Sequence, residues 1–315
     1  MLGESWPRVR TLMAEYLHTD VNLLADTNKS VLEHGGKFMR PMVSLLTAQA
    51  AGGINEDSLR LAAATEILHN ATLMHDDVTD GSKERRGVPT LMSVLGPSAA
   101  VLVGDFWLAK AVEVVFDTSC QDKVKRLYSR TMSDLSEGEM LQLEKSISAD
   151  TDREAYLRII YCKTASLFRT ACMSAAISVS AADRLLEAAS GYGTALGMAF
   201  QIKDDILDYA GTPELGKPVG VDIREGKITL PLLGAIRNLP ERETEIREIV
   251  RNAGKDGSAC SEVRDIVLNN GGMEYASEVL DTYIEKAVTA TEAYDASPFR
   301  DALREMARYN ACRQV

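Results

Sequence analysis

The sequence predicts an all-α protein, built as a large bundle of stacked helices. Aromatic residues make up only 6% of the 315 residues, and runs of alternating β-branched residues between Asn-Gly or Asp-Gly turns are scarce, so strands are expected to be nearly absent. Long segments instead place apolar residues at helical spacing and end at Gly or Pro. Several of them exceed twenty residues, which favours a bundle with deep walls.

The expected helices follow one another along the chain, each drawn where the helical apolar spacing begins and ends. They are predicted at Trp6–Tyr16, Asp20–Glu33, Pro41–Ala51, Glu56–Val78, Ser98–Phe116, Asp122–Glu144, Asp152–Ser178, Ala182–Tyr209, Leu230–Ile236, Glu241–Asn252, Ser261–Asn269, Met273–Thr291 and Pro298–Tyr309. Three irregular connections are expected, and all contain Gly with Lys or Arg: Glu33–Arg40, Asp80–Pro89 and Gly211–Thr229. With no Pro/Ser-rich linker or fixed-period repeat, residues 1–315 are predicted to form a single domain.

Composition excludes several classes of protein. Forty-six acidic against thirty-five basic residues give a net charge of −11, which argues against a nucleic-acid partner. The five cysteines are odd in number and far apart, so neither a disulfide framework nor a zinc site is expected. The N-terminus does not read as a signal peptide, and no apolar segment approaches ~20 residues. A cytoplasmic location without stable membrane insertion is therefore predicted.

Two acidic clusters point to a metal site. Asp76, Asp77 and Asp80 form D-D-x-x-D in LMHDDVTD, at the end of a long helix. Residues four apart share one helix face, so these carboxylates repel one another unless a cation neutralises them. The same spacing recurs in QIKDDILDY, with Asp204, Asp205 and Asp208 at the end of another long helix. Acid is disfavoured near helix C-termini, so solubility does not explain the pair, and a magnesium site is predicted.

Basic residues frame two anion sites. GGKFMRP supplies Lys37 and Arg40 beside two glycines, and Arg85 and Arg86 precede Gly87 just beyond the first cluster. Arginines in such a Gly-flanked turn can bind phosphates in bidentate fashion. Further along, Lys163 and Thr164 interrupt an apolar helix, and Lys217 and Lys227 follow the second cluster. One anion is therefore expected to be bridged by metal and the other held by basic side chains alone.

Together these blocks resemble the all-trans isoprenyl diphosphate synthases, also called polyprenyl synthetases. GGKFMRP, HNATLMHDDVTD with RRG, the Lys163–Thr164 pair, FQIKDDILDY and GKPVGVDIREGKITLPL occur in the family's order across nearly the whole chain. The resemblance implies the all-α isoprenoid-synthase bundle with a central cavity between the two aspartate-rich helices. It also implies a homodimer.

The resemblance further assigns roles to the residues. The six aspartates would hold about three Mg²⁺ ions that bridge to the diphosphate of an allylic primer, with Asp76, Asp80 and Asp204 as the surest direct ligands. Donors to that diphosphate would be Arg85, Lys163, Thr164, Gln201, Lys217 and Lys227. Isopentenyl diphosphate would lie on Lys37, Arg40, His69 and Arg86. Catalysis itself is assigned to Asp76, Asp80, Lys163, Asp204 and Lys217.

The implied reaction is ionisation, condensation and elimination. Cations stabilise the departing pyrophosphate more strongly in the transition state than in the ground state. Isopentenyl diphosphate then attacks the allylic cation, and a proton is lost. The implied primer is farnesyl or geranylgeranyl diphosphate. Ala71 and Thr72 lie five and four residues before Asp76, where bulky aromatics stop short-chain members of the family. Their small size predicts a long all-trans product, from hexaprenyl to decaprenyl with octaprenyl in the middle.

Four other interpretations remain open. A short-chain farnesyl or geranylgeranyl diphosphate synthase would use every residue named above with a different tunnel floor. A non-catalytic subunit of a heteromeric prenyltransferase generally loses aspartates from these motifs, and this chain keeps all six. A terpene cyclase usually replaces the second cluster with Asn, Ser or Thr and Glu. A bundle that only binds cations leaves the basic residues unexplained.

Overall fold

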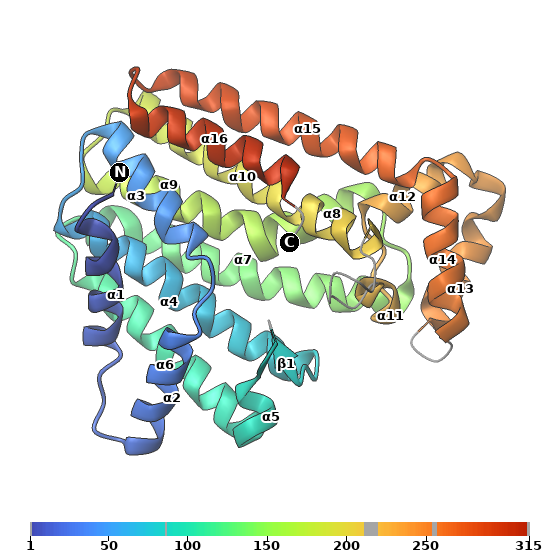
Figure 1. Ribbon diagram of the computed structural model, residues 1–315, viewed down its shortest axis with the longest axis horizontal. Helices are drawn as coiled ribbons and strands as arrows, with labels where there is room; N and C mark the ends of the chain where they lie inside the picture. Colours follow the sequence, from blue (N-terminus) through green and yellow to red (C-terminus); the bar gives the residue numbers. More distant parts are fainter. Residues whose placement is uncertain (1, 86, 211–219, 254–256, 314–315) are drawn as a thin grey trace. The chain divides into compact units, whose positions relative to one another are not determined.

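The chain folds as an almost entirely helical protein (Figure 1), and the all-α prediction is confirmed. The computed structural model describes residues 2–85, 87–210, 220–253 and 257–313. Within these ranges the only strands are β1 (Glu84–Arg85) and β2 (Val88–Pro89), which pair antiparallel. No helix among the described residues is both long and apolar enough to cross a membrane.

Two compact units divide the chain. The first comprises Met1–Arg130, Leu167–Ser190 and Ala293–Leu303, and the second comprises Thr131–Ser166, Gly191–Glu292 and Arg304–Val315. The assignment of residues 1–315 to a single domain therefore stays a prediction.

The first unit is built on the long helix α4, which packs mainly against α6. Its complete elements are α1 (Ser5–Tyr16), α2 (Asn22–Glu33), α3 (Met39–Ala51), α4 (Glu56–Thr79), β1, β2, α5 (Leu91–Leu95) and α6 (Pro97–Phe116). Helix α4 begins directly after Asn55, which caps its N-terminus. The side chain of Asn55 accepts from the Ser58 backbone N–H at 2.8 Å, and the Ser58 side chain accepts from the Asn55 backbone N–H in return. The negative charges of Glu56 and Asp57 in the first turn are stabilised by the positive end of the helix dipole.

The second unit has its core where α8, η1, α10 and the helices after α10 meet. Its elements include most of α7 (Gln121–Ser148) and α10 (Asp183–Ala210), with α8 (Arg153–Ile160), η1 (Tyr161–Ala165), α11 (Val221–Arg224), α12 (Leu230–Asn238), η3 (Pro240–Arg242), α13 (Glu243–Asn252), α14 (Gly257–Asn269), α15 (Gly272–Ala290) and nearly all of η4 (Thr291–Ala293). Buried Tyr156, Tyr209 and Leu230 belong to one apolar cluster there. Helices α9 (Ser166–Ser178) and α16 (Pro298–Cys312) contribute residues to both units.

Most predicted helix boundaries agree with the structure within a few residues, and three predictions were wrong. The expected continuous helix Asp152–Ser178 is interrupted by η1, a π-helical turn whose wider hydrogen bonding leaves no mark in apolar spacing. The segment Asp80–Pro89 is not wholly irregular, because it contains the β1–β2 hairpin. Helices α5 and α11 were missed because five and four residues are too few to show a period.

Candidate active site

The first aspartate cluster lies at the C-terminal end of α4 in the first unit. Asp77 is 7% exposed, Asp76 is half-buried and Asp80 is exposed. The Nε of Arg85 donates to Oδ1 of Asp77 at 2.8 Å. Burial raises the pKa of Asp77, the Arg85 guanidinium opposes this shift, and the charge of Asp80 adds to it. The cluster therefore contains one buried carboxylate, bound by Arg85, and two that are more accessible.

The β1–β2 hairpin positions Arg85. Arg85 pairs with Val88 across the hairpin, and the Thr90 hydroxyl donates to the Ser82 carbonyl at 2.6 Å, which ties the end of the hairpin to the segment after α4. Gly87 turns the chain with φ of +75°, in the left-handed region that favours glycine. Arg86, the other predicted arginine of this turn, lies outside the described residues.

Helix α6 supports the first cluster through His75, which directly precedes Asp76. The Nε2 of His75 lies 3.3 Å from Oδ1 of Asp105. Gly104, the residue before Asp105, faces the same ring, and a Cβ on Gly104 would lie 2.6 Å from His75 Cδ2. The ring thus occupies space that only a glycine leaves open.

The residues predicted for isopentenyl diphosphate also lie in the first unit. Lys37 is exposed, whereas Arg40 on α3 and His69 on α4 are half-buried. The Arg40 guanidinium carbon lies 4.6 Å from the centre of the Phe168 ring, a cation–π contact that fixes its plane. That these three side chains share one anion stays a prediction.

Neutral donors surround Asp205, the buried aspartate of the second cluster, which lies in the second unit. Asp205 on α10 is 3% exposed and accepts from the Tyr156 hydroxyl at 2.6 Å and from Gln201 Nε2 at 2.9 Å. The Thr164 hydroxyl donates to Gln201 Oε1 at 2.8 Å. A continuous chain of hydrogen bonds therefore runs from the π-turn through Gln201 to the buried carboxylate, and it joins two of the predicted diphosphate donors.

The other two aspartates of this cluster have different partners. Asp208 accepts from the backbone N–H groups of Val221 and Asp222 at 3.1 and 3.3 Å, so its carboxylate binds the first turn of α11. Asp204 pairs with Arg313 at 2.8 Å, and the Asp204 side chain remains 40% exposed. Asp204 is thus more accessible than the buried Asp205.

A fourth carboxylate, Asp222, joins the second cluster and was not predicted. Burial raises its pKa to about 7, the charge of Asp208 adds to the shift, and Lys227 opposes it. Burial also raises the pKa of Asp208, and raises that of Asp205 well above its usual value. The only sequence signal was an acid between the second cluster and Lys227, and its proximity to Asp208 is a product of folding.

Some of these residues line a cavity of about 130 Å³ within the second unit. Two ammonium groups, Lys163 and Lys227, and two carboxylates, Asp205 and Asp222, line it together with Gln201. The sequence-predicted residues Lys163, Gln201, Asp205 and Lys227 are therefore brought together. Lys217 lies outside the described residues.

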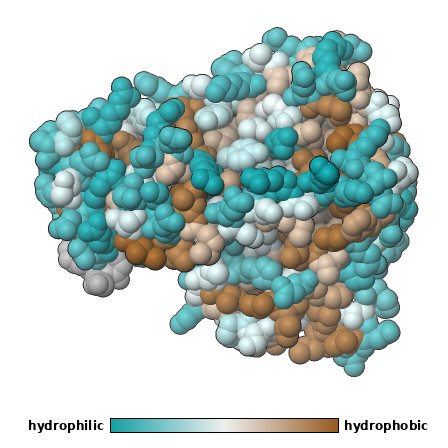
Figure 2. All heavy atoms as spheres, turned by 180° about the vertical axis from the view of Figure 1, so that it is seen from behind, coloured by the Kyte–Doolittle hydropathy of each residue, from teal (hydrophilic) through white to brown (hydrophobic). Residues whose placement is uncertain are grey.

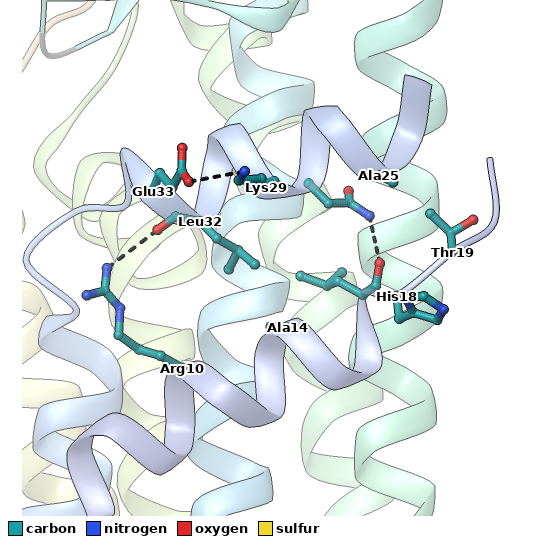
Figure 3. Close-up of a pocket in the computed structure, with 10 residues that line it drawn as sticks. Arg10, Ala14, His18, Thr19, Ala25, Lys29, Leu32 and Glu33 are labelled. Carbon is teal, nitrogen blue, oxygen red and sulfur yellow. Dashed lines mark hydrogen bonds and ion pairs between the residues drawn. The ribbon is translucent and has the colours of Figure 1, made fainter. Parts of the chain in front are cut away.

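A larger cavity of about 550 Å³ lies between α1 and α2 (Figure 3). Arg10, His18 and Lys29 border it, and Lys29 points toward Glu33 on the same helix. No predicted site residue lines it. Its size alone does not make it the candidate active site, because none of the six aspartates is among the residues that line it.

The donor chemistry of both clusters fits Mg²⁺. Every candidate ligand is a carboxylate oxygen, the donor type that this hard cation prefers. Among the described residues no three His, Cys, Asp or Glu side chains form a complete metal cage. Mg²⁺ commonly takes only one or two carboxylates and keeps water or phosphate oxygens as its other ligands. Asp76, Asp80 and Asp204 are half-buried or exposed, whereas Asp77 and Asp205 are buried, so the first three suit that role better.

The two predicted product-length residues lie on α4. Ala71 is fully buried, and Thr72 is half-buried with its hydroxyl donating to the His69 carbonyl at 2.8 Å. Both side chains are small, as the prediction requires. A tunnel beside them stays a prediction.

The chain is similar to known proteins over most of its length. The sequence pattern of the family described as polyprenyl synthetase matches residues 21–267. The all-trans-nonaprenyl-diphosphate synthase (geranyl-diphosphate specific) of Rhodobacter capsulatus is 39% identical over 298 residues, covering 93% of this chain and 90% of its own. The octaprenyl diphosphate synthase of Escherichia coli K12 is 36% identical over 297 residues, covering 94% and 91%.

The likeness extends to three dimensions. The crystal structure of a polyprenyl synthase from Caulobacter crescentus CB15, complexed with calcium and isoprenyl diphosphate, has a TM-score of 0.93 and 36% identity, and the match covers 100% of this chain and 96% of that one. The predicted isoprenoid-synthase fold is confirmed.

Proposed function

The chain belongs to the polyprenyl synthetase family, and from that premise we propose that it is a magnesium-dependent prenyltransferase making long all-trans polyprenyl diphosphates. It would condense isopentenyl diphosphate with farnesyl or geranylgeranyl diphosphate. The observation that carries the proposal is the joined set of Lys163, Thr164, Gln201 and Asp205, which unites cationic and neutral donors with a buried carboxylate. Such a set suits an allylic diphosphate.

The protein's own groups bind and orient both substrates. Lys163, Thr164, Gln201 and Lys227 donate to the allylic diphosphate, with Arg85, which also pairs with Asp77, and Lys217 completing the set. Lys37, Arg40, His69 and Arg86 hold isopentenyl diphosphate. Asp76, Asp77, Asp80, Asp204, Asp205 and Asp208 would hold about three Mg²⁺ ions. When bound, these ions supply positive charge that stabilises pyrophosphate as its bond to the allylic carbon breaks.

The chemistry needs no protein nucleophile. The donors around the diphosphate favour the transition state, in which negative charge grows on the departing pyrophosphate, over the intact allylic diphosphate. The double bond of isopentenyl diphosphate attacks the allylic cation, forming the new carbon–carbon bond. Loss of a proton, which the released pyrophosphate can accept, restores a double bond and leaves the extended diphosphate.

A long product is supported by the small side chains of Ala71 and Thr72 on α4 and by the nonaprenyl and octaprenyl synthases among the relatives. Thr72→Phe tests this point. A bulky ring one helical turn before Asp76 is expected to end synthesis at geranylgeranyl diphosphate. If the variant and the native enzyme gave the same ladder of products, Thr72 would not line the tunnel.

The proposal includes a homodimer in the cytoplasm that contacts membranes only transiently, to release product. Hydrophobic side chains interrupt the hydrophilic surface of the protein (Figure 2). Large exposed ones include Leu102 in the first unit at 69% and Ile147 in the second at 70%. Apolar surface of this kind is suited to burial against a second copy. Sedimentation of the purified protein tests this state.

The decisive experiment incubates the purified protein with magnesium, labelled isopentenyl diphosphate and either primer, and sizes the products by chromatography. A ladder ending at one long product is expected. Products no longer than geranylgeranyl diphosphate would favour the short-chain synthase. No condensation by folded protein would favour the non-catalytic subunit.

A further inference from the structure

Lys163 is held by a glycine–glutamate pair on a neighbouring helix. Its Nζ lies 2.8 Å from Oε1 and 2.9 Å from Oε2 of Glu139 on α7, so both carboxylate oxygens accept from one ammonium. The Lys163 side chain is 22% exposed and that of Glu139 34%. An ion pair that is mostly shielded from water is stronger than one on an open surface.

Gly138 lets α7 come close enough for this pair to form. A Cβ on Gly138 would lie 2.7 Å from Cys162 Cβ, 2.9 Å from Lys163 Cγ and 3.1 Å from the Lys163 backbone nitrogen. Two of these distances are shorter than real Cβ contacts. Since two of the three atoms are a Cβ and a backbone nitrogen, any larger residue at 138 must displace the π-turn itself.

The π-turn η1 directs its two polar residues toward different helices. Lys163 meets Glu139 on α7, whereas the adjacent Thr164 donates to Gln201 on α10. A π-turn adds one residue to the helical turn, and such turns are frequent at functional sites. Displacing η1 away from α7 would therefore disturb both Lys163 and the hydrogen-bond chain that ends at Asp205.

We propose that Gly138 and Glu139 are positioning residues for the allylic diphosphate site and act through Lys163. Neither touches the substrate. Gly138 fixes where the π-turn lies, and Glu139 holds the ammonium of a flexible lysine in one direction. This inference rests on the proposed function, since it is the allylic diphosphate that Lys163 meets.

The test compares Gly138→Ala and Glu139→Gln with two matched controls. Gly191 is an interior glycine of α10 whose added Cβ would lie 3.8 Å from Ala290 Cβ, an ordinary contact. Glu137 is a neighbour on α7 whose 46% exposed side chain pairs with Arg158 at 3.7 Å. Gly191→Ala and Glu137→Gln should keep native kinetics, because the contacts of these two residues are with Ala290 and Arg158, which lie outside η1.

Gly138→Ala should raise KM for the allylic diphosphate about 10–100-fold, as small misplacements of binding groups do. KM for isopentenyl diphosphate should stay within about twofold, since other residues bind it. Glu139→Gln should raise the allylic KM about threefold, in line with a partly exposed ion pair. In a Lys163→Met background, Glu139→Gln should have no further effect, because it acts through that lysine.

Calorimetry with inorganic pyrophosphate and magnesium gives a readout independent of turnover, and Gly138→Ala should weaken binding by the same factor as its KM rises. Equal pyrophosphate affinity in Gly138→Ala and native protein would overturn the role of Gly138. An unchanged or lower allylic KM in Glu139→Gln would overturn that of Glu139. An equal rise in KM for the allylic diphosphate and for isopentenyl diphosphate in Gly138→Ala would indicate general disruption of the fold and would also overturn the inference. A native protein that binds pyrophosphate but condenses nothing would instead refute the proposed function.

Discussion

The same D-D-x-x-D spacing produces two different electrostatic environments at the ends of α4 and α10. At α4 the buried carboxylate is Asp77, and it is paired with the charged Arg85 of a short hairpin. At α10 the buried carboxylate is Asp205, whose partners are the neutral Tyr156 and Gln201. The buried carboxylate of the same motif therefore has a charged partner at one end and neutral partners at the other.

The difference lies in what surrounds each helix end. The α4 end runs into an exposed turn, so Asp80 is in water. The α10 end has Asp208 bound to α11 and Asp222 close by, and burial raises the pKa of Asp205, Asp208 and Asp222. Charged groups that are enclosed together and repel one another favour an added cation. The second cluster should therefore depend on bound cations for its ionised form more than the first.

The largest expected effect is loss of condensation when either cluster loses an aspartate. Asp76→Asn and Asp204→Asn should each lower kcat/KM by about 10²–10³-fold, the range for removing one group that stabilises developing charge. Steady-state kinetics at saturating magnesium would measure this. Thermal unfolding should be little changed for Asp76→Asn, which has a half-buried side chain at a helix end. Full activity in either variant would contradict the assignment of that cluster.

Gly104→Ala should have the next largest effect, and this substitution tests how α6 supports the first cluster. The new methyl group would meet the His75 ring, and overpacking of this kind costs about 1–3 kcal/mol. We expect lower thermal stability together with a higher magnesium requirement, because His75 directly precedes Asp76. A variant with native stability and native magnesium dependence would show that the ring can turn away at no cost. Gly191→Ala again provides a tolerant control.

Arg313→Met should have a smaller effect, confined to the second cluster. The Arg313 guanidinium lies 4.1 Å from the centre of the Phe200 ring, and Arg313 donates to the Phe200 carbonyl and to Asn310 at 2.7 Å each. Its loss should reduce the free energy of unfolding by about 2 kcal/mol. Since the arginine charge competes with any cation at Asp204, half-maximal activity should need several-fold less magnesium. A higher requirement would mean that Arg313 orients Asp204 instead.

The sequence predicted most of the fold because the long helices carry a clear apolar period and definite ends, as Asn55 and Ser58 show for α4. It also identified both aspartate clusters, whose spacing is local. It could not reveal Asp222, Glu139, Asp105 or Arg313, because each acts through a partner far along the chain. The π-turn was not predicted either, because the extra residue in that helical turn depends on packing against neighbouring helices, including the close approach of Gly138.

The smallest expected effect separates the two clusters most directly, by replacing the buried aspartate of each with asparagine. Asp77→Asn removes the charge that Arg85 binds, so the free energy of unfolding should fall by about 0.5–1 kcal/mol, as for a partly exposed ion pair.

In Asp205→Asn the free energy of unfolding should not fall, because the substitution removes a buried charge and its repulsion from Asp222. The Gln201 amide can turn to match the new donor. Both variants should be inactive or nearly so, which makes denaturant unfolding without magnesium the informative measurement. Equal losses of stability in the two variants would mean that Tyr156 and Gln201 stabilise the carboxylate of Asp205 as well as Arg85 stabilises that of Asp77. In that case the contrast between the two helix ends would be one of exposure alone.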